Sequence, residues 1–391
     1  MWGCRGTARR LYPCATMCSM ERVDVLVVGA GPAGSSTAIH LARGGARVVL
    51  ADKARFPRDK PCGGGLTGRA LKQIPVDPSA VVERDVDRFE LRLRYGSRFA
   101  RSHDRPLIRM TQRRRLDAWL VEQAATAGAE VRTGARVEGL ASEGTGVTAT
   151  VGGVPVRADV VVGADGANGV VARLFGLGAE IIHGVALEGN VPLAALAADH
   201  ERSATIELAV VPGGYGWVFP KGDHANLGVG GWGSEGPHLR EHLARLARAH
   251  GVEPASLTEV RGHRLPMRRL GMPAGAGRVL LVGDAAGLVD PLSGDGMYEA
   301  FVSARLAADA IVRGALDGYT AALSAALDHH AAASWAAKRA FDRYPRVVYA
   351  AARAPGVFKV VAGLLCGDVG HPSEARGAAR APLKVIARLA G

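Results

Sequence analysis

The stretch that most constrains the fold is ERVDVLVVGAGPAGSSTAIHLARGGARVVLADK, at residues 21–53. It reads as a β-branched strand, a glycine turn, a helix and a second strand, and therefore predicts a βαβ unit of a doubly wound α/β domain. Gly29, Gly31 and Gly34 form the G-x-G-x-x-G spacing at the turn, where backbone amides can approach a pyrophosphate. Asp52 ends the second strand, at the spacing required to hold a ribose hydroxyl. The unit predicts a dinucleotide site and leaves open whether the ligand is FAD or NAD.

Two later segments repeat the pattern of a buried strand that runs into a glycine-rich turn. The first, ADVVVGADGANGVVARLFG, carries Asp165, and the second, RVLLVGDAAGLVDPLSGDGMYEAFVSARLAADAI, carries Asp284 at the end of its strand. Gly294 and Gly296 then lead into a helix that we expect to begin near Met297. A carboxylate at a strand end can accept hydrogen bonds from sugar hydroxyls, and a helix N-terminus can stabilise negative charge on a reduced flavin ring. These segments favour FAD.

In this order the three segments resemble the FAD-binding signature of the para-hydroxybenzoate hydroxylase-like flavoproteins, over most of residues 22–315. The resemblance implies a Rossmann-like domain with FAD as cofactor. Arg113, in RRRLD, matches an arginine that contacts the cofactor, and Val137, in GARVEGL, matches a strand whose backbone meets adenine. Asp165 is expected to be structural or to guide a nicotinamide donor. The implied cofactor contacts are Gly29, Gly31, Ala33, Gly34, Asp52, Lys53, Cys62, Gly63, Arg113, Val137, Asp284, Gly294, Gly296 and Met297.

A second distinctive stretch is PGGYGWVFPKGDHANLGVGG, at residues 212–231. It places Tyr215, Trp217 and Phe219 at alternate positions in a chain that is only 5% aromatic. Alternation of this kind puts all three rings on one face of a strand. Pro220 then ends the strand. The pattern predicts either a ridge packed into the core or a wall for a long apolar or flat ligand.

A third stretch, PRDKPCGGGLTGRAL at residues 57–71, follows the second strand of the βαβ unit. The consecutive glycines Gly63, Gly64 and Gly65 would let backbone lie against a ring or a substrate without an intervening side chain. Cys62 precedes them directly, and its thiol is a candidate proton donor. The alternative is a small buried residue packed beneath the cofactor. Both interpretations of the cysteine stay open.

Taken together, KPCGGGLT and the pattern Pro-x-x-Tyr-x-Trp-x-Phe-Pro followed by Gly-x-Gly resemble the geranylgeranyl reductase family. Every fixed position of that pattern is present, from Pro212 to Gly230. The resemblance implies an FAD-dependent reductase that saturates isolated carbon–carbon double bonds of a polyprenyl chain, carried by an isoprenoid lipid, diphosphate, pigment or quinone. It also implies that the aromatic side chains line the channel for that chain.

The implied reaction gives a hydride from reduced FAD to one alkene carbon and a proton to the other. An unactivated alkene is a poor hydride acceptor, so the site must supply close positioning and a well-placed acid. The acid is Cys62, Tyr215 or a held water, and the expected catalytic set is Cys62, Tyr215 and Trp217. The electron donor is NADPH or NADH, with a ferredoxin-type protein as the alternative. The expected substrate contacts are Gly64, Gly65, Tyr215, Trp217, Phe219 and Pro220.

Three other functions compete with this interpretation. Aromatic monooxygenases share the FAD motifs, but nothing requires them to carry the cysteine–glycine stretch or the aromatic pattern. Flavin-dependent halogenases carry a Trp-x-Trp-x-Ile-Pro motif, and this chain has Tyr215 where the first tryptophan would stand. A non-catalytic lipid or quinone carrier is the third alternative, and the intact cofactor motifs speak against it.

Composition narrows the partners and the location. The net charge of +12 suits nucleic acid, anionic lipid or a phosphorylated substrate, but no nucleic-acid-binding motif accompanies it. No uninterrupted apolar run approaches the roughly 20 residues of a spanning helix. Five cysteines without metal-ligand spacing predict neither a disulfide framework nor a metal site, and hence a cytoplasmic protein. A polyprenyl substrate adds peripheral contact with the membrane surface as an alternative.

The expected domain organisation is discontinuous. The basic tail ARGAARAPLKVIARLAG predicts a terminal helix that packs on its own domain or rests on anionic membrane. The expected divisions are a disordered or spurious extension at residues 1–20, an FAD-binding domain at 21–75, 107–180 and 275–330, a β-rich substrate domain at 76–106 and 181–274, and a C-terminal helical region at 331–391.

Overall fold

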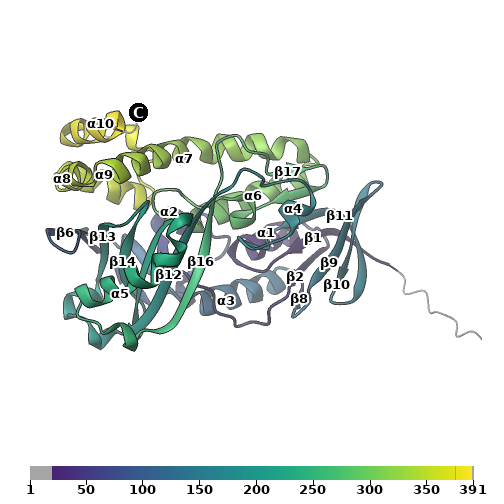
Figure 1. The fold of residues 1–391 in the computed structure, drawn as a ribbon. Coiled ribbons are helices and arrows are strands. Elements are labelled where there is room, and N and C mark those ends of the chain that lie inside the picture. The colour runs from purple at the N-terminus through teal and green to yellow at the C-terminus, as the bar shows by residue number, and fades with distance from the viewer. Residues whose placement is uncertain (1–19, 375, 390–391) are drawn as a thin grey trace, which may run out of the picture.

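A largely parallel sheet forms the half of the molecule that carries the glycine motifs (Figure 1). The computed structural model describes residues 20–374 and 376–389, so residues 1–19 of the expected extension lie outside the described chain. Valine- and leucine-rich strands are buried here, as expected of a sheet covered by helices. The strand order is β17 (Gly275–Ala276), β18 (Val279–Leu281), β11 (Val154–Gly163), β1 (Glu21–Val28), β2 (Val48–Asp52) and β8 (Glu130–Thr133).

Helices pack against this sheet and complete its core. Helix α1 lies between α3 and α6, and an antiparallel hairpin of β9 and β10 continues from β11. Helix α6 begins at Met297, the residue at which the sequence predicts its start. The bounds are α1 (Pro32–Arg43), α3 (Arg113–Thr126), α4 (Val171–Leu174), α6 (Met297–Val312), β9 (Val137–Glu143) and β10 (Gly146–Val151).

A seven-stranded sheet forms the second half and carries the aromatic pattern (Figure 1). Its neighbouring strands pair antiparallel except β13 and β5, which are parallel. Helix α5 (Leu239–Ala249) packs on one face, and the other face bears the aromatic rings. The strand order is β16 (Thr258–Met267), β12 (Ile182–Pro192), β15 (His224–Trp232), β14 (Gly214–Pro220), β13 (Ser203–Val211), β5 (Arg88–Leu93) and β6 (Arg98–Ser102).

A small third sheet carries the cysteine–glycine stretch out of the first domain. It consists of β3 (Gly65–Thr67), β7 (Ile108–Met110) and β4 (Arg84–Val86), and β3 leads directly into the short helix α2 (Gly68–Leu71). Apolar residues of β4 and β7 pack in one cluster with Ala204 of the seven-stranded sheet. The cysteine–glycine stretch is thereby anchored between the two large sheets.

Four helices close the chain above the seven-stranded sheet (Figure 1). They are α7 (Tyr319–Arg343), α8 (Pro345–Ala352), α9 (Pro355–Cys366) and α10 (Arg380–Leu389). Pro345 and Pro355 each begin a new helix, which is a position that proline favours. The division expected at residues 330 and 331 is wrong as a structural boundary, since α7 runs through it without interruption.

No single helix in the described ranges, 20–374 and 376–389, is both long and apolar enough to cross a bilayer. Helices α8 and α9 meet that requirement only as a pair, and the pair is bent by 88°. Apolar side chains of α7 and α8, among them Phe341 and Tyr349, pack instead on Leu208 of the seven-stranded sheet.

Candidate active site

The three glycines of the first motif are required for different reasons. A Cβ at Gly29 would lie 2.3 Å from the carbonyl oxygen of Ala164, and one at Gly34 would lie 1.8 Å from that of Gly29. A Cβ at Gly31 would meet only the ends of two arginine side chains, at 3.7 and 3.9 Å. The first and third glycines therefore permit close packing of protein backbone. The second keeps space free in front of the N-terminus of α1.

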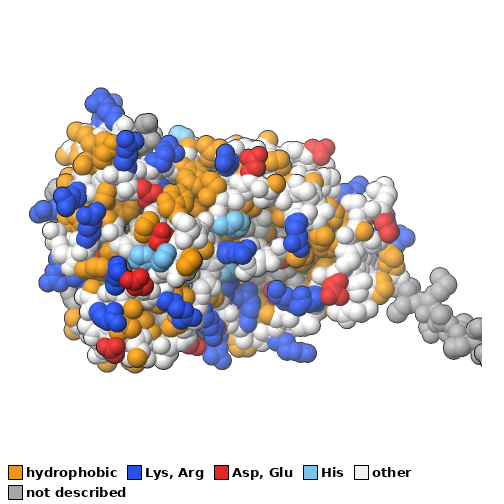
Figure 2. Space-filling view, in the orientation of Figure 1, with side chains coloured by type: hydrophobic (Ala, Val, Ile, Leu, Met, Phe, Trp, Pro, Cys, Tyr) orange, Lys and Arg blue, Asp and Glu red, His pale blue; other side chains and the backbone are white. Residues whose placement is uncertain are grey.

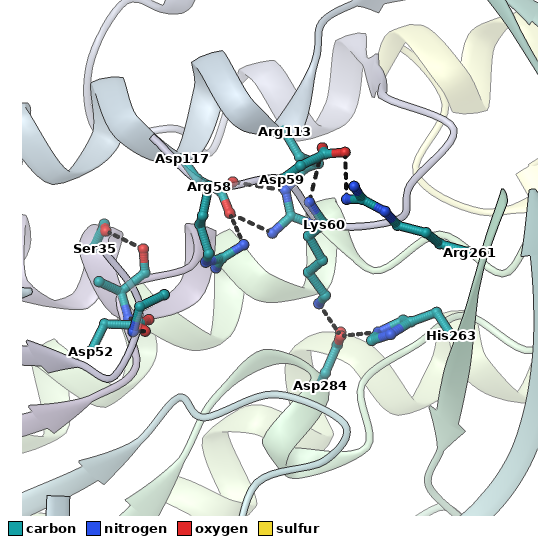
Figure 3. Close-up of polar contacts among 12 residues, drawn as sticks. Ser35, Asp52, Arg58, Asp59, Lys60, Arg113, Asp117, Arg261, His263 and Asp284 are labelled. Atoms are coloured by element: carbon teal, nitrogen blue, oxygen red, sulfur yellow. Dashed lines mark hydrogen bonds and ion pairs between the residues drawn. The ribbon is translucent and has the colours of Figure 1, made fainter. Parts of the chain in front are cut away.

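Two guanidinium groups stand in front of that helix N-terminus (Figure 3). Arg113 forms two hydrogen bonds with Asp117, of 2.7 and 2.8 Å, and Arg58 pairs with the same carboxylate at 3.1 Å. The nearest atoms to a Cβ on Gly31 are Nη2 of Arg58 and of Arg113. Two cations with one shared carboxylate leave net positive charge beside the helix dipole, which is an arrangement that favours phosphate.

Arg58 lies in the loop after β2, inside the stretch at residues 57–71, but nothing in that stretch indicates its pairing with Asp117. The pairing of Arg113 with Asp117 has a visible signal, since residues four apart on a helix face one another.

The ribose-binding acid predicted at Asp52 lies beside the glycine turn. Its two carboxylate oxygens accept the amides of Ala30 and Ala54, each at 2.8 Å. The backbone oxygen of Asp52 accepts the amide of Ala135, which ties the segment before Val137 to the end of β2. Val137 itself begins β9. The carboxylate is thus held at the end of β2 with acceptor capacity left over.

Asp284 lies across from this motif and pairs with two residues from elsewhere in the chain (Figure 3). Its Oδ2 is 3.0 Å from Nζ of Lys60 and 3.7 Å from Nε2 of His263. Burial raises the pKa of this carboxyl, but Lys60 and His263 outweigh burial, so the pKa falls well below its usual range. A Cβ on Gly296 would lie 3.3 Å from Oδ1. The structure therefore brings Asp284 and the loop before α6 together.

Three further residues of the predicted cofactor set have different surroundings. Ala33 packs at the first turn of α1 so closely that a Cβ on Gly283 would lie 2.9 Å from its own, which joins the first and third motifs. Gly294 has a φ of +67°, a backbone conformation that favours glycine. Lys53 directly follows β2, and its side chain is exposed.

Asp165 has a structural role, which is one of the two expectations for it. Its Oδ2 accepts the amides of Val170 and Val171, at 2.6 and 3.0 Å. These are the amides at the start of α4, so the carboxylate caps that helix.

The aromatic rings share one face of β14, as the alternation predicts. The ring centres of Tyr215 and Trp217 are 6.1 Å apart, and those of Trp217 and Phe219 are 6.4 Å apart. A Cβ on Gly228 would lie 2.0 Å from the Trp217 ring. The indole therefore occupies the space that a side chain at Gly228, on the neighbouring strand β15, would fill.

Two hydrogen bonds fix these rings. Nε1 of Trp217 donates to Oδ1 of Asn226 at 2.8 Å, so this indole is held in place and offers no free proton. The hydroxyl of Tyr215 donates to the backbone oxygen of Ser293, in the loop before α6. Burial raises the pKa of the Tyr215 phenol, which makes it a weaker acid. Both polar hydrogens are therefore engaged, and a catalytic role for either side chain stays a prediction.

The cysteine–glycine stretch passes directly under the aromatic surface. A Cβ on Gly63 would lie 3.0 Å from the Phe219 ring and 3.8 Å from Nε1 of Trp217. At the other two glycines the close neighbours are protein atoms, since a Cβ on Gly64 would lie 2.2 Å from the Thr111 oxygen, and one on Gly65 would lie 2.8 Å from Ile108. Packing therefore explains Gly64 and Gly65, and their contact with substrate stays a prediction. The last ridge residue, Pro220, is buried at the end of β14.

Cross-strand register divides the face that bears the rings into an apolar and a polar part. The apolar part continues from β14 across β13 and β5, where Ile206 pairs with Trp217 and Leu91 pairs with Ile206. The polar part lies beyond Gly228, where Glu188 of β12 and Arg261 of β16 continue the same row. Residues paired across strands share a face. One end of this face is therefore apolar and the other is polar, and Phe341 and Tyr349 pack on the apolar end.

The residues present fit FAD. The uncapped N-terminus of α1, the two guanidinium groups and the cleared space at Gly31 suit a pyrophosphate, while Asp52 offers its carboxylate to a ribose. By the resemblance of the third motif, Asp284 would hold the ribityl chain of FAD, and Gly296, in the loop before α6, would lie beside the flavin ring.

Comparisons with known proteins match the FAD-binding part of the chain and its relatives. The FAD binding domain family matches residues 22–312. The menaquinone reductase of Mycolicibacterium smegmatis is 32% identical over 341 residues, which cover 81% of this chain and 83% of the relative. The chloroplastic geranylgeranyl diphosphate reductase of Oryza sativa subsp. japonica is 34% identical over 325 residues, which cover 77% and 68%.

Solved structures share the fold. A geranylgeranyl bacteriochlorophyll reductase-like protein of Thermoplasma acidophilum superposes with a TM-score of 0.77 at 22% identity, over 95% of this chain and all of the other. The flavin-dependent brominase Bmp2 superposes with a TM-score of 0.69 at 21% identity, over 93% and 98%. Identities this low show a common fold and no common reaction. The sequence relatives and the matched domain decide the family: the chain belongs to the geranylgeranyl reductase family of FAD-dependent oxidoreductases.

Proposed function

We propose that this protein saturates isolated carbon–carbon double bonds of a polyprenyl chain carried by an isoprenoid lipid, diphosphate, pigment or quinone. The observation that carries the proposal is the meeting of three parts at β14. The aromatic surface packs on Gly63 beside Cys62, continues into an apolar part on β13 and β5, and is tied through Tyr215 to the loop before α6. An apolar wall that reaches the flavin loop suits a long alkene chain.

The protein groups act by positioning and by excluding water. Bound FAD supplies, once reduced, the hydride that one alkene carbon accepts. The indole of Trp217, fixed by Asn226 and by the space at Gly228, holds the chain flat at the surface. Phe341 and Tyr349 of the C-terminal helices pack on the apolar part of the sheet face and exclude water from it. Orientation and exclusion of water are the two contributions that an unactivated alkene most requires.

We propose that the proton comes from Cys62. Its thiol lies on the loop that touches the aromatic surface, whereas the hydroxyl of Tyr215 is engaged by Ser293 and the indole N–H of Trp217 is engaged by Asn226. Loss of a general acid typically costs about 10²-fold or more in rate. Cys62→Ser should therefore lower turnover by about that factor with FAD still bound, and unchanged turnover would remove Cys62 from this role.

Flavin reoxidation tests the reaction. Reduced holoenzyme is mixed anaerobically with geranylgeranyl diphosphate or a geranylgeranyl ether lipid, and each fully saturated analogue serves as the matched control. We expect the oxidised flavin spectrum to return with an unsaturated chain and not with its saturated analogue. Menaquinone must be scored by the mass of its side chain, because the quinone ring itself accepts electrons. Reoxidation that does not depend on the alkene would contradict the proposal.

The electron donor is proposed to be NADPH or NADH, with a ferredoxin-type protein as the alternative. The net charge of +12 supports a phosphorylated or acidic donor. Anaerobic reduction of the flavin by NADPH at a rate no slower than turnover is the expected result. Reduction by a reduced ferredoxin alone would favour the alternative.

Peripheral contact of a cytoplasmic protein with anionic membrane is proposed for the C-terminal helices. Val347, Val361 and Val385, on α8, α9 and α10, are 40%, 42% and 44% exposed. Figure 2 shows lysine and arginine side chains around hydrophobic ones at the upper left, where Figure 1 places these helices. Exposed valines among cations suit anionic lipid. Exposed cations on and before α10 are Arg376, Arg380, Lys384 and Arg388.

Co-sedimentation with vesicles of phosphatidylglycerol tests this contact. Val385→Glu should reduce the bound fraction, and Val154→Glu is the matched control because Val154 is equally exposed at 44% on the FAD domain. Equal binding of both variants and of the unaltered protein would contradict a membrane role for α10.

A further inference from the structure

Lys221 is a cation buried inside the substrate half of the molecule. It follows β14 directly, and only 5% of the residue is exposed. Its Nζ donates to the backbone oxygen of Cys62 at 3.0 Å. Burying an ammonium group is costly unless the surroundings use its charge. The contact that it makes here is on the residue proposed to give the proton.

Glu188 binds the backbone N–H of the same cysteine. Its Oε1 accepts the amide of Cys62 at 2.8 Å. Burial raises the pKa of the Glu188 carboxyl, while Lys221 and the Cys62 amide oppose that rise. Glu188 lies on β12 and Lys221 directly follows β14, and together the two charged side chains hold both the N–H and the C=O of Cys62. Lys221 lies inside the stretch at residues 212–231 but is not a fixed position of its pattern, and Glu188 lies outside all the motifs.

The sulfur itself has a third partner. The amide of Gly64 donates to Sγ of Cys62 at 3.4 Å. Gly64 has a φ of +81°, and a Cβ there would lie 2.2 Å from the Thr111 oxygen, so glycine is required to direct this amide at the sulfur. An N–H pointing at sulfur stabilises a negative charge on it.

We propose that Lys221 and Glu188 are positioning residues for Cys62, and that the charge of Lys221 stabilises the sulfur anion left after proton transfer while Glu188 opposes it. In that step the S–H bond breaks, a C–H bond forms at the alkene carbon that does not receive the hydride, and the electron pair stays on sulfur. A proton from water then restores the thiol. The catalytic part of this inference rests on the proposed function, but the electrostatic part does not.

Alkylation of Cys62 tests the electrostatic part without substrate. Oxidised holoenzyme is treated with iodoacetamide across a range of pH, and modification of the Cys62 peptide is followed by mass spectrometry, which separates it from the four other cysteines. The thiolate is the reactive form, so the pH midpoint of the rate reports the charge balance around the sulfur. The charged groups beside this cysteine are Lys221, Glu188 and Arg113.

The two variants should shift the midpoint in opposite directions. Lys221→Met removes the stabilising charge, so its midpoint should rise and its alkylation at neutral pH should slow by about threefold or more. Glu188→Gln removes the opposing charge, so its midpoint should fall. Lys359→Met, an exposed lysine on α9, is the matched control and should leave the midpoint unchanged.

Shifts in the same direction, or no shift, would overturn the inference. If Lys221→Met does not fold, Glu188→Gln decides alone, because an unchanged or raised midpoint contradicts it. Measurement of turnover then separates the effect of the charges on Cys62 from its role as proton donor. Opposite midpoint shifts with full turnover in Cys62→Ser would keep the charge pair and refute Cys62 as the proton donor.

Discussion

Glycine has opposite meanings in the two halves of this molecule. In the FAD domain, Gly31 keeps space free beside two guanidinium groups. In the substrate sheet, Gly228 provides space that the protein itself fills with the indole of Trp217. In the cofactor half the missing side chain of a glycine leaves empty space for a ligand. In the substrate half the missing side chain makes room for an aromatic ring of the protein, and the ring is thereby held in one position.

The difference teaches that a glycine-rich stretch does not by itself reveal a ligand. Gly34 and Gly64 lie in the two motifs that most strongly indicate function, yet the atoms closest to a Cβ at either position are backbone oxygens of the protein. Substituting glycines of each kind with alanine separates the effects on folding, on turnover and on cofactor affinity.

The largest effect is expected for Gly34→Ala. The new Cβ would lie 1.8 Å from the backbone oxygen of Gly29, and neither partner can move without displacing α1. We expect a loss of about 3 kcal/mol in the free energy of unfolding, measured by denaturant titration of the FAD-free protein. Gly236→Ala is the matched control, since no atom lies within 4 Å of a Cβ there. Equal stability of the two variants would contradict this packing role.

Gly228→Ala should affect turnover more than stability. The contact is with a side chain, because the Cβ would lie 2.0 Å from the Trp217 ring, and the ring can shift. We expect about 1–3 kcal/mol of destabilisation. Misplacing the wall should lower turnover by about 10²-fold. Titration of FAD fluorescence should show unchanged cofactor affinity, and a variant with full turnover would show that the pose of Trp217 does not matter.

Gly31→Ala should leave folding intact and weaken FAD binding. Its Cβ would have ordinary contacts of 3.7 and 3.9 Å in the protein alone, so the unfolding free energy should change by less than about 0.5 kcal/mol. Crowding of the phosphate space should raise the Kd for FAD by about tenfold. Arg58→Met should produce a similar loss that shrinks at high salt. Unchanged affinity in both variants would place the pyrophosphate elsewhere.

The smallest effect concerns acid stability through Asp284. Because its folded-state pKa is depressed, the unfolded chain takes up the proton first as the pH falls below about 4. The stabilisation is therefore present at neutral pH and is lost in acid. Asp284→Asn should show a flatter fall in unfolding free energy between about pH 5 and pH 3. An equally steep fall in the variant would mean that the pairing with Lys60 and His263 contributes nothing.

Features coded in one short segment could be predicted from the sequence. The dinucleotide turn, the start of α6 at Met297 and the placement of three rings on one face of β14 depend on local spacing alone. Periodicity in a strand or helix is a property of neighbouring residues, so these predictions needed no tertiary information.

The contacts that shape the chemistry could not be predicted in the same way. Several side chains bind residues that lie far from them in the sequence, and no motif reveals these pairings, although some of the side chains lie inside the quoted stretches. They are Arg58, Lys60, Glu188, Lys221 and His263. Alternation along β12 puts Glu188 on a face, but only the packing of the small third sheet brings Cys62 to that face. The division expected at residues 330 and 331 was misplaced, because α7 runs through it and nothing in the composition changes there.

The central claim is that a prenyl double bond gains hydrogen at this aromatic wall. The most direct measurement is mass spectrometry of products after FAD-loaded, chemically reduced protein is held anaerobically with geranylgeranyl diphosphate, a geranylgeranyl lipid and menaquinone together. The account predicts that at least one of them gains two hydrogen atoms for each bond reduced. No gain under those conditions, with oxygen or halide incorporated into an aromatic once air is admitted, would contradict it and assign the site to a monooxygenase or halogenase.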